Sequence, residues 1–200
     1  MNDLVSRLTE TLEKNLFVEM EASGRHVHLT QEDALSLFGH GLTKKADLSQ
    51  PGQYVANERV CVQWEKGSLE RVAVLGPCRN QTQVELSLTD AVTLGIKPPV
   101  RLSGDLRGAA DVKILGVNGM VKGKAIVAKR HIHMSTEDAK RHGLQNGDSI
   151  SLRALTDRPT VFEDLPVRVD ENFATRVHLD YDEANACHFK KGDLGLMLYE

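Results

Sequence analysis

The chain has 200 residues, of which 40% are hydrophobic, so it is long enough and apolar enough to bury one or two globular cores. Its 25 Lys and Arg residues nearly balance 28 Asp and Glu residues, the net charge is −3, and only 4% of residues are aromatic. This composition excludes the basic surface and stacking aromatics of a nucleic-acid-binding protein, and no apolar run approaches the ~20 residues of a membrane span.

The first predicted element is an amphipathic helix at residues 2–16. Its apolar residues recur at spacings of three and four and therefore share one face: Leu4, Val5, Leu8, Leu12 and Leu16. We expect this helix to pack on the body of the protein; an interaction helix that recruits a partner is the alternative. The N-terminus has neither the basic region nor the unbroken apolar stretch of a secretion signal, so we expect a cytoplasmic protein.

Short β-strands interrupted by short helices are expected next. A His-x-His strand, His26 to His28, is followed by Thr30 and Asp33, a hydroxyl and acid pair typical of a helix start. Further strands are indicated by β-branched residues between turn signals, at 59–63, 71–75, 125–128, 149–152 and 167–169. Many short strands favour a mainly β fold with barrels or sandwiches.

A candidate anion site follows a Gly-Pro turn. Arg79 stands six residues before Glu85, and its planar guanidinium suits bidentate binding of a phosphate or carboxylate. Ser103 is a candidate to add a hydroxyl to the same site, although its sequence is also typical of a plain turn. No base is specified for Cys78, so we interpret this cysteine as structural, and the absence of any C-x-x-C pair predicts free thiols.

The chain contains an internal repeat. Residues 25–29, Arg-His-Val-His-Leu, return at 130–134 as Arg-His-Ile-His-Met, and each copy is followed at the same distance by Glu-Asp-Ala. A looser match relates residues 85–91 to residues 178–184. Two matches of this kind predict two related β-barrel domains.

The expected boundary between the two barrels lies near residues 100–115, where a loop-rich junction is indicated by Gly95, Pro98-Pro99, Gly104 and Gly108. The predicted organisation is therefore an N-terminal amphipathic helix at 1–16, a first β-barrel domain at 17–105 and a second β-barrel domain at 106–200.

The histidines of the repeat are candidate metal ligands. Residues i and i+2 of a strand point to the same face, so each His-x-His aims two imidazoles at one point. The repeat adds a third ligand in each half, which gives the sets His26, His28 and Glu85, and His131, His133 and His178. Imidazole and carboxylate suit zinc, and three ligands leave a catalytic ion one open position. The alternative is that each His-x-His only presents polar side chains to solvent or to buried partners.

Four segments in order along the chain resemble the PduL-type phosphotransacylases, the phosphate propanoyltransferases of bacterial microcompartments. They are Gly24-Arg25-His26-Val27-His28-Leu29, Gly76-Pro77-Cys78-Arg79 through Thr82-Gln83-Val84-Glu85, Arg130-His131-Ile132-His133-Met134, and His178-Leu179-Asp180-Tyr181-Asp182-Glu183-Ala184-Asn185-Ala186. The similarity extends from about Met20 to the C-terminus.

The resemblance implies an acyltransferase that interconverts short-chain acyl-CoA plus phosphate with acyl phosphate plus CoA. It implies two zinc ions at the junction of two β-barrel domains, on the two ligand sets given above. It also implies that Arg79 binds phosphate and that Ser103 lies beside it. Location in the lumen of a bacterial microcompartment is implied as well, with residues 2–16 contacting shell or core proteins; a homo-oligomer is compatible with the sequence.

Two other functions are consistent with the same residues. A dizinc hydrolase of thioesters or phosphate esters would use paired metals to activate water, and it would need no phosphate. A metal-stabilised, non-catalytic scaffold would use zinc to close each barrel. Structural zinc sites usually have four protein ligands, often thiolates, and three ligands without cysteine argue against the scaffold.

Overall fold

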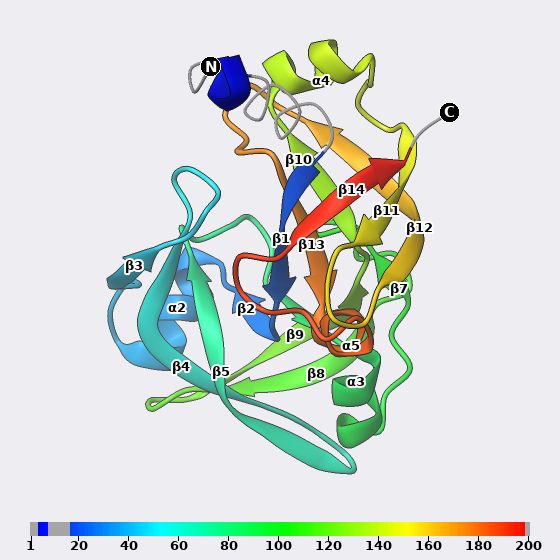
Figure 1. Ribbon diagram of the computed structural model, residues 1–200. Helices are drawn as coiled ribbons and strands as arrows, with labels where there is room; N and C mark the ends of the chain where they lie inside the picture. Colours follow the sequence, from blue (N-terminus) through cyan, green and yellow to red (C-terminus); the bar gives the residue numbers. More distant parts are fainter. Residues whose placement is uncertain (1–3, 8–16, 199–200) are drawn as a thin grey trace. The chain divides into compact units, whose positions relative to one another are not determined.

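The computed structural model describes residues 4–7 and 17–198, and the chain forms two compact units (Figure 1). The central unit comprises Gly24–Lys129, and the terminal unit joins Met1–Ser23 to Arg130–Glu200. Strands predominate in both units and the helices are short, which confirms the expected mainly β fold. The strands expected from β-branched residues all lie within strands of the structure.

The central unit contains a closed ring of strands. In ring order these are β4 (Tyr54–Trp64), β5 (Gly67–Gly76), β2 (His26–His28), β6 (Gln83–Leu86), β9 (Met120–Ala128) and β8 (Ala110–Leu115). The ring closes because β8 pairs with both β9 and β4. Two short strands extend it, β3 (Lys44–Asp47) beside β4 and β7 (Val100–Arg101) beside β9. Two helices, α2 (Gln31–Phe38) and α3 (Leu88–Leu94), follow the strands β2 and β6, which carry the candidate ligands.

The terminal unit is a second closed barrel. In ring order its strands are β1 (Phe17–Ser23), β13 (Arg176–Asp180), β10 (His131–Met134), β12 (Thr160–Val169), β11 (Ser149–Ala154) and β14 (Leu194–Leu198). Its helices are α4 (Thr136–His142) after β10 and α5 (Tyr181–Ala186) after β13. The prediction of two barrels from the repeat is therefore confirmed.

The division of the chain between the barrels differs from the boundary predicted at 105/106. Strand β1 pairs with β13 and β14 and belongs to the terminal unit, and β9 pairs with β6 and β8 and belongs to the central unit. Each of these two strands directly precedes a His-x-His strand of the other unit. The loop-rich stretch at 100–115 lies inside the central unit. Turn residues occur both in loops within a barrel and in linkers between barrels. They therefore did not distinguish these two kinds of connection.

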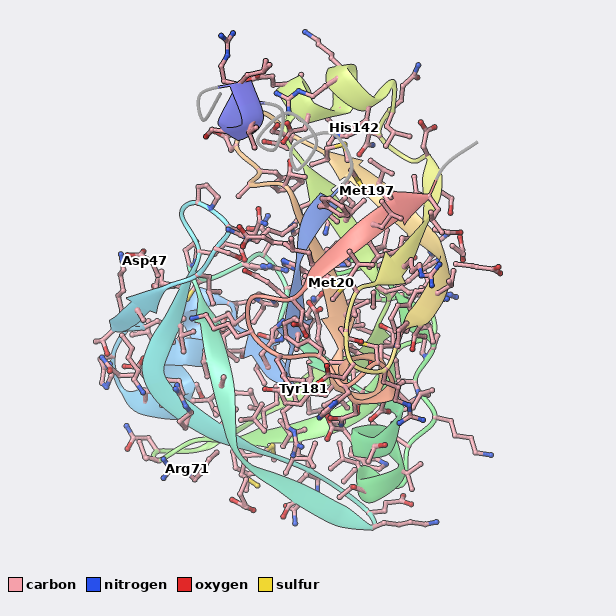
Figure 2. All side chains as sticks on the ribbon, in the orientation of Figure 1. Met20, Asp47, Arg71, His142, Tyr181 and Met197 are labelled. Carbon is pink, nitrogen blue, oxygen red and sulfur yellow. The ribbon has the colours of Figure 1, made fainter. Side chains whose placement is uncertain are left out.

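Alternation along the strands separates a core from a polar face. Val27 and Val84 pair in register and are completely buried in the central core, and Ile132 and Val177 do the same in the terminal core. Met20 and Met197, labelled in Figure 2, belong to the terminal core as well. Because successive side chains of a strand point to opposite faces, the two histidines of β2 lie together on the face opposite Val27. The two histidines of β10 likewise lie together on the face opposite Ile132.

The repeat is also visible in local geometry. Thr30 caps α2 by accepting a hydrogen bond from the backbone N–H of Asp33, which confirms the predicted helix start, and Ser135 caps α4 in the same way from Asp138. The left-handed backbone residues Arg71 in β5 and Asp164 in β12 occupy equivalent places. Both lie beside register shifts in the pairing of their strands, as expected for β-bulges.

The predicted N-terminal helix falls largely outside the described residues. Residues 4–7 are helical, whereas residues 2–3 and 8–16 of the prediction are not described. Leu4 and Val5, the two members of the apolar stripe that are described, are 64% and 57% exposed. Burial of the stripe against the body is therefore not found at these two positions.

Candidate functional site

The first candidate metal cluster lies in the central unit. His26 and His28 come from β2 and Glu85 from the neighbouring strand β6, where His26 and Glu85 are partners in register. All three are buried, with exposed fractions of 6%, 3% and 6%. The Nε2 atoms of both histidines lie 3.5 Å from Glu85 Oε1, so three potential ligand atoms converge.

These separations fit a tetrahedral dication. Ligand atoms that are each about 2.0–2.1 Å from a tetrahedral zinc ion lie about 3.4 Å apart, close to the distances between the Nε2 atoms and the carboxylate oxygen. His26 Nδ1 donates a hydrogen bond of 2.8 Å to the carbonyl oxygen of Gly24, which leaves the Nε2 lone pair directed away from the backbone. The donor set and its orientation therefore suit a bound metal ion.

Burial and mutual charge determine the protonation of this cluster. Burial lowers the pKa of His28 to about 4, so its imidazole is neutral at pH 7, the form that binds a metal. Burial on its own raises the pKa of Glu85, but the adjacent His26 and His28 outweigh it and hold the pKa well below its ordinary value. Glu85 is therefore a carboxylate under ordinary conditions.

A hydrogen-bond network joins the cluster to the predicted anion site. Ser103 Oγ donates to Glu85 Oε1 at 2.6 Å and accepts from Arg79 Nη1 at 2.8 Å. Gln83 Nε2 donates to Glu85 Oε1 at 2.5 Å and to Ser103 Oγ at 2.7 Å, while its own oxygen accepts from the backbone N–H of Gly104 at 3.0 Å. The structure thus brings together all five site residues predicted in this unit and places one serine between the guanidinium and the carboxylate.

The second candidate cluster lies in the terminal unit. His131 and His133 come from β10 and His178 from β13, with His131 and His178 partners in register. The ring centroids are 4.7 Å apart for His131 and His133, 5.1 Å for His131 and His178, and 4.8 Å for His133 and His178. The three rings therefore surround one point, and the chemistry of three imidazoles fits the same class of metal ion.

A threonine and an aspartate anchor the ligand strands in the same way in both units. In the central unit, Thr82 Oγ1 accepts from the N–H of Thr30 at 3.1 Å and donates to Asp33 in α2. In the terminal unit, Thr175 accepts from the N–H of Ser135 at 3.0 Å and donates to Asp138 in α4. Each threonine stands three residues before the third ligand of its cluster. These hydrogen bonds therefore connect the end of each His-x-His strand to the strand that carries the third candidate ligand.

Comparison with known proteins assigns the family. The model of the phosphate propanoyltransferase family matches residues 19–190. The chain is 48% identical to a phosphate propanoyltransferase of Clostridioides difficile, over 99% of this chain and 97% of the relative. It is 46% identical to one of Listeria monocytogenes, over 98% and 96%, and 47% identical to one of Thermotoga maritima, over 95% and 93%. The chain belongs to the phosphate propanoyltransferase family. It is therefore an acyltransferase, and the resemblance stated from the sequence is confirmed.

The cysteines of this family member do not have the properties of nucleophiles. Cys61, Cys78 and Cys187 are all free thiols. Burial raises the pKa of the Cys78 thiol, although this residue directly precedes Arg79 in the chain. A thiol that stays protonated at neutral pH is a poor nucleophile, which agrees with the structural role predicted for Cys78.

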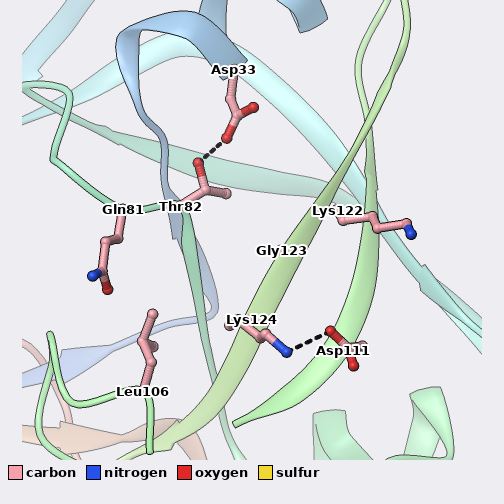
Figure 3. Close-up of a pocket in the computed structure, with 8 residues that line it drawn as sticks. All are labelled: Asp33, Gln81, Thr82, Leu106, Asp111, Lys122, Gly123 and Lys124. Carbon is pink, nitrogen blue, oxygen red and sulfur yellow. Dashed lines mark hydrogen bonds and ion pairs between the residues drawn. The ribbon is translucent and has the colours of Figure 1, made fainter.

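The central unit contains a cavity whose lining includes Asp33, Thr82, Asp111 and Lys124. It has a volume of about 570 Å³ (Figure 3). Its polar side chains are largely engaged with one another: Thr82 donates to Asp33, and Lys124 pairs with Asp111 at 2.8 Å. None of the predicted ligands lines it, nor does Arg79 or Ser103, so we assign it no part in the transfer.

Residues near the clusters that were not predicted from the sequence include Gln83 and Glu21, and also Arg168 and Phe173 beside His133. Gln83 is two residues before Glu85 on the same strand, so strand alternation was a signal that placed it on the ligand face. Glu21 lies 3.4 Å from His178, but its strand pairs with one more than 150 positions away, and no local pattern indicates that contact.

Among the helices in the described part of the chain, none has the length and apolar character needed to cross a membrane.

Proposed function

We propose that this member of the family is a zinc-dependent phosphotransacylase that interconverts short-chain acyl-CoA plus phosphate with acyl phosphate plus CoA. Family membership supports transfer of an acyl group. The observation that carries the finer proposal is the link from Glu85 through Ser103 to Arg79, since it joins a metal-binding carboxylate to an anion-binding side chain. A thioester hydrolase or a non-catalytic scaffold would need no phosphate-binding arginine next to the metal cluster, whereas a phosphate-ester hydrolase is separated from a transacylase by the phosphate dependence tested below.

The two clusters would hold one zinc ion each. His26, His28 and Glu85 would bind one ion, and His131, His133 and His178 the other. Bound zinc would supply Lewis acidity toward the thioester carbonyl and a site for the soft thiolate sulfur of CoA. Three protein ligands in each cluster leave a coordination position for a substrate atom.

Arg79 and Ser103 act on the phosphate. The guanidinium of Arg79 binds two phosphate oxygens at once, and its hydrogen bond to Ser103 fixes the orientation of the fork. A phosphate oxygen attacks the thioester carbonyl carbon, the C–O bond forms, the C–S bond breaks, and CoA leaves as its thiolate. The acyl group passes directly to phosphate in this proposal, and the raised pKa of the Cys78 thiol, which makes it a poor nucleophile, is consistent with a transfer that has no covalent enzyme intermediate.

Phosphate dependence tests this proposal. The purified full-length chain is expected to release thiol from acetyl-CoA or propanoyl-CoA when inorganic phosphate is present, and to release almost none without it. A thiol-reactive dye measures the release, and hydroxylamine trapping detects the acyl phosphate formed. Thiol release at equal rates with and without phosphate would identify a hydrolase and contradict the proposal.

We further propose that the protein works in the lumen of a bacterial microcompartment and that residues 2–16 contact shell or core proteins there. The exposure of Leu4 and Val5 supports an apolar face open to a partner. Deletion of residues 1–16 is expected to abolish co-localisation with shell proteins while leaving activity and the thermal midpoint nearly unchanged, because no predicted ligand lies in this segment. A large fall in the thermal midpoint would show instead that the segment stabilises the fold.

A further inference from the structure

A carboxylate lies in line with the histidines of the terminal cluster. Glu21 in β1 is the register partner of His178 in β13, and His178 is the register partner of His131 in β10. Side chains in register on adjacent strands share a face, so all three lie on the ligand face of the barrel. Glu21 Oε2 is 3.4 Å from His178 Nε2, close to the 3.5 Å between the carboxylate of Glu85 and the histidines of the central cluster.

The register partners at the same level of the central unit provide a comparison for Glu21. There His26 in β2 is the partner of Glu85 in β6, and Glu85 is the partner of Ile126 in β9. The carboxylate thus occupies the middle strand in the central unit and the outer strand in the terminal unit. Three neutral imidazoles leave the full charge of a dication uncompensated, whereas two imidazoles and a carboxylate remove one unit of it. The carboxylate of Glu21 would supply this one negative charge at the terminal cluster.

Neighbouring arginines set the orientation of the Glu21 side chain and the balance of charge around the terminal cluster. Arg176 Nε lies 3.3 Å from Glu21 Oε1, which turns the other oxygen of Glu21 toward His178. The same guanidinium also pairs with Glu19, so one positive charge serves two carboxylates. On the other side of the cluster, Arg168 Nη1 lies 3.4 Å from His133 Nε2 and adds a positive charge that opposes cation binding. A nearby anion would therefore favour a dication at the three histidines.

We propose that Glu21 is a positioning residue of the terminal metal centre, whose carboxylate raises the affinity of the three-histidine cluster for a dication. The inference rests on the proposed function in one respect, namely that His131, His133 and His178 bind zinc. It goes beyond it by assigning a role to a residue outside both ligand sets. Carboxylates beside metal ligands typically change metal affinity by about 10–100-fold when they are removed.

Zinc titration of the metal-free, full-length chain against a chromophoric chelator tests the role. Glu21→Gln keeps the size of the side chain and removes its charge, so we expect one of two sites to bind zinc about 10–100-fold more weakly and the other to be unchanged. Glu19→Gln is the matched control. It lies two residues away on the same strand and contacts the same Arg176, but it is 59% exposed and makes no ion pair with His178, so its zinc affinities should equal those of the wild type.

Two further variants separate charge from structure and identify the site. Glu21→Asp keeps the negative charge and should bind zinc more tightly than Glu21→Gln. In a His131→Ala background, where only the central cluster remains, Glu21→Gln should have no further effect on the remaining site. Circular dichroism of each metal-free variant monitors the fold.

The outcomes distinguish this inference from the proposed function. Two unchanged zinc affinities in Glu21→Gln, or equal weakening in Glu21→Asp and Glu21→Gln, would overturn the role of Glu21 and leave the two-zinc proposal intact. A folded wild-type chain that binds no zinc would overturn both.

Discussion

Replacement of His26 or His131 by alanine is expected to lower phosphotransacylase activity by about 10²-fold or more and to reduce the zinc content from about two ions per chain to about one. A Lewis-acid metal contributes several kcal/mol to stabilising a transition state, and about 1.4 kcal/mol corresponds to a tenfold change in rate. His26 and His131 are both buried and occupy equivalent places in the two three-residue clusters, so each variant should affect a different ion.

The control for both variants is His40→Ala. His40 is a histidine of the central unit, its side chain is 57% exposed, and it belongs to neither cluster. Activity and zinc content of this variant should match those of the wild type. Near-normal rates and two bound zinc ions in both His26→Ala and His131→Ala would show that the repeated histidines have a structural role only.

The second large effect is expected at Arg79. Arg79→Ala should lower kcat/KM for phosphate by about 10²–10³-fold, because removal of one preorganised donor to developing charge typically costs that factor. The fold should persist, since Ser103 keeps its hydrogen bonds to Gln83 and Glu85. Arg79→Lys retains the charge without the planar fork, so it should recover only part of the loss.

Arg107→Ala is the matched control for Arg79. This arginine lies four residues after Ser103, its side chain is 86% exposed, and its ion pair is with Asp105 at 2.7 Å. Steady-state kinetics with varied phosphate should distinguish the two positions. A KM for phosphate and a kcat near wild-type values in Arg79→Ala would contradict the assignment of Arg79 as the phosphate-binding residue.

The convergence of the candidate ligands was predictable because it follows from a rule that acts within a few residues. Strand alternation places His26 and His28 on one face, and the repeat carries the same geometry to His131 and His133. The third ligands, Glu85 and His178, were predictable only because the repeat aligned them. In the structure each is the register partner of the first histidine of its set.

The closure of the barrels could not be read from the sequence. Strand β1 leads directly into the His-x-His strand of the central unit, yet it pairs in parallel with β13 at the far end of the chain. Strand β9 likewise precedes β10 and pairs with β6. Pairing between distant strands depends on packing of the whole barrel, and β-propensity carries no information about which partner a strand will have. For this reason the two units of the chain differ from the division predicted at 105/106.

The same limit explains why the carboxylate near the terminal cluster was missed. Glu21 reaches His178 only through the long-range pairing of β1 with β13. Gln83 was within reach of the alternation rule, but an amide is not a metal ligand of the zinc type, and its role in linking Ser103 to Glu85 depends on side-chain geometry. Groups that support a site are therefore harder to predict than the ligands that form it.

The zinc content of the purified, desalted full-length chain tests the central claim most directly. Mass spectrometry of the metal should give about two zinc ions per chain. A strong chelator should remove them together with phosphate-dependent thiol release, and added zinc should restore that activity. A folded chain that carries no metal and transfers acyl groups to phosphate at the same rate with and without a chelator would contradict the account.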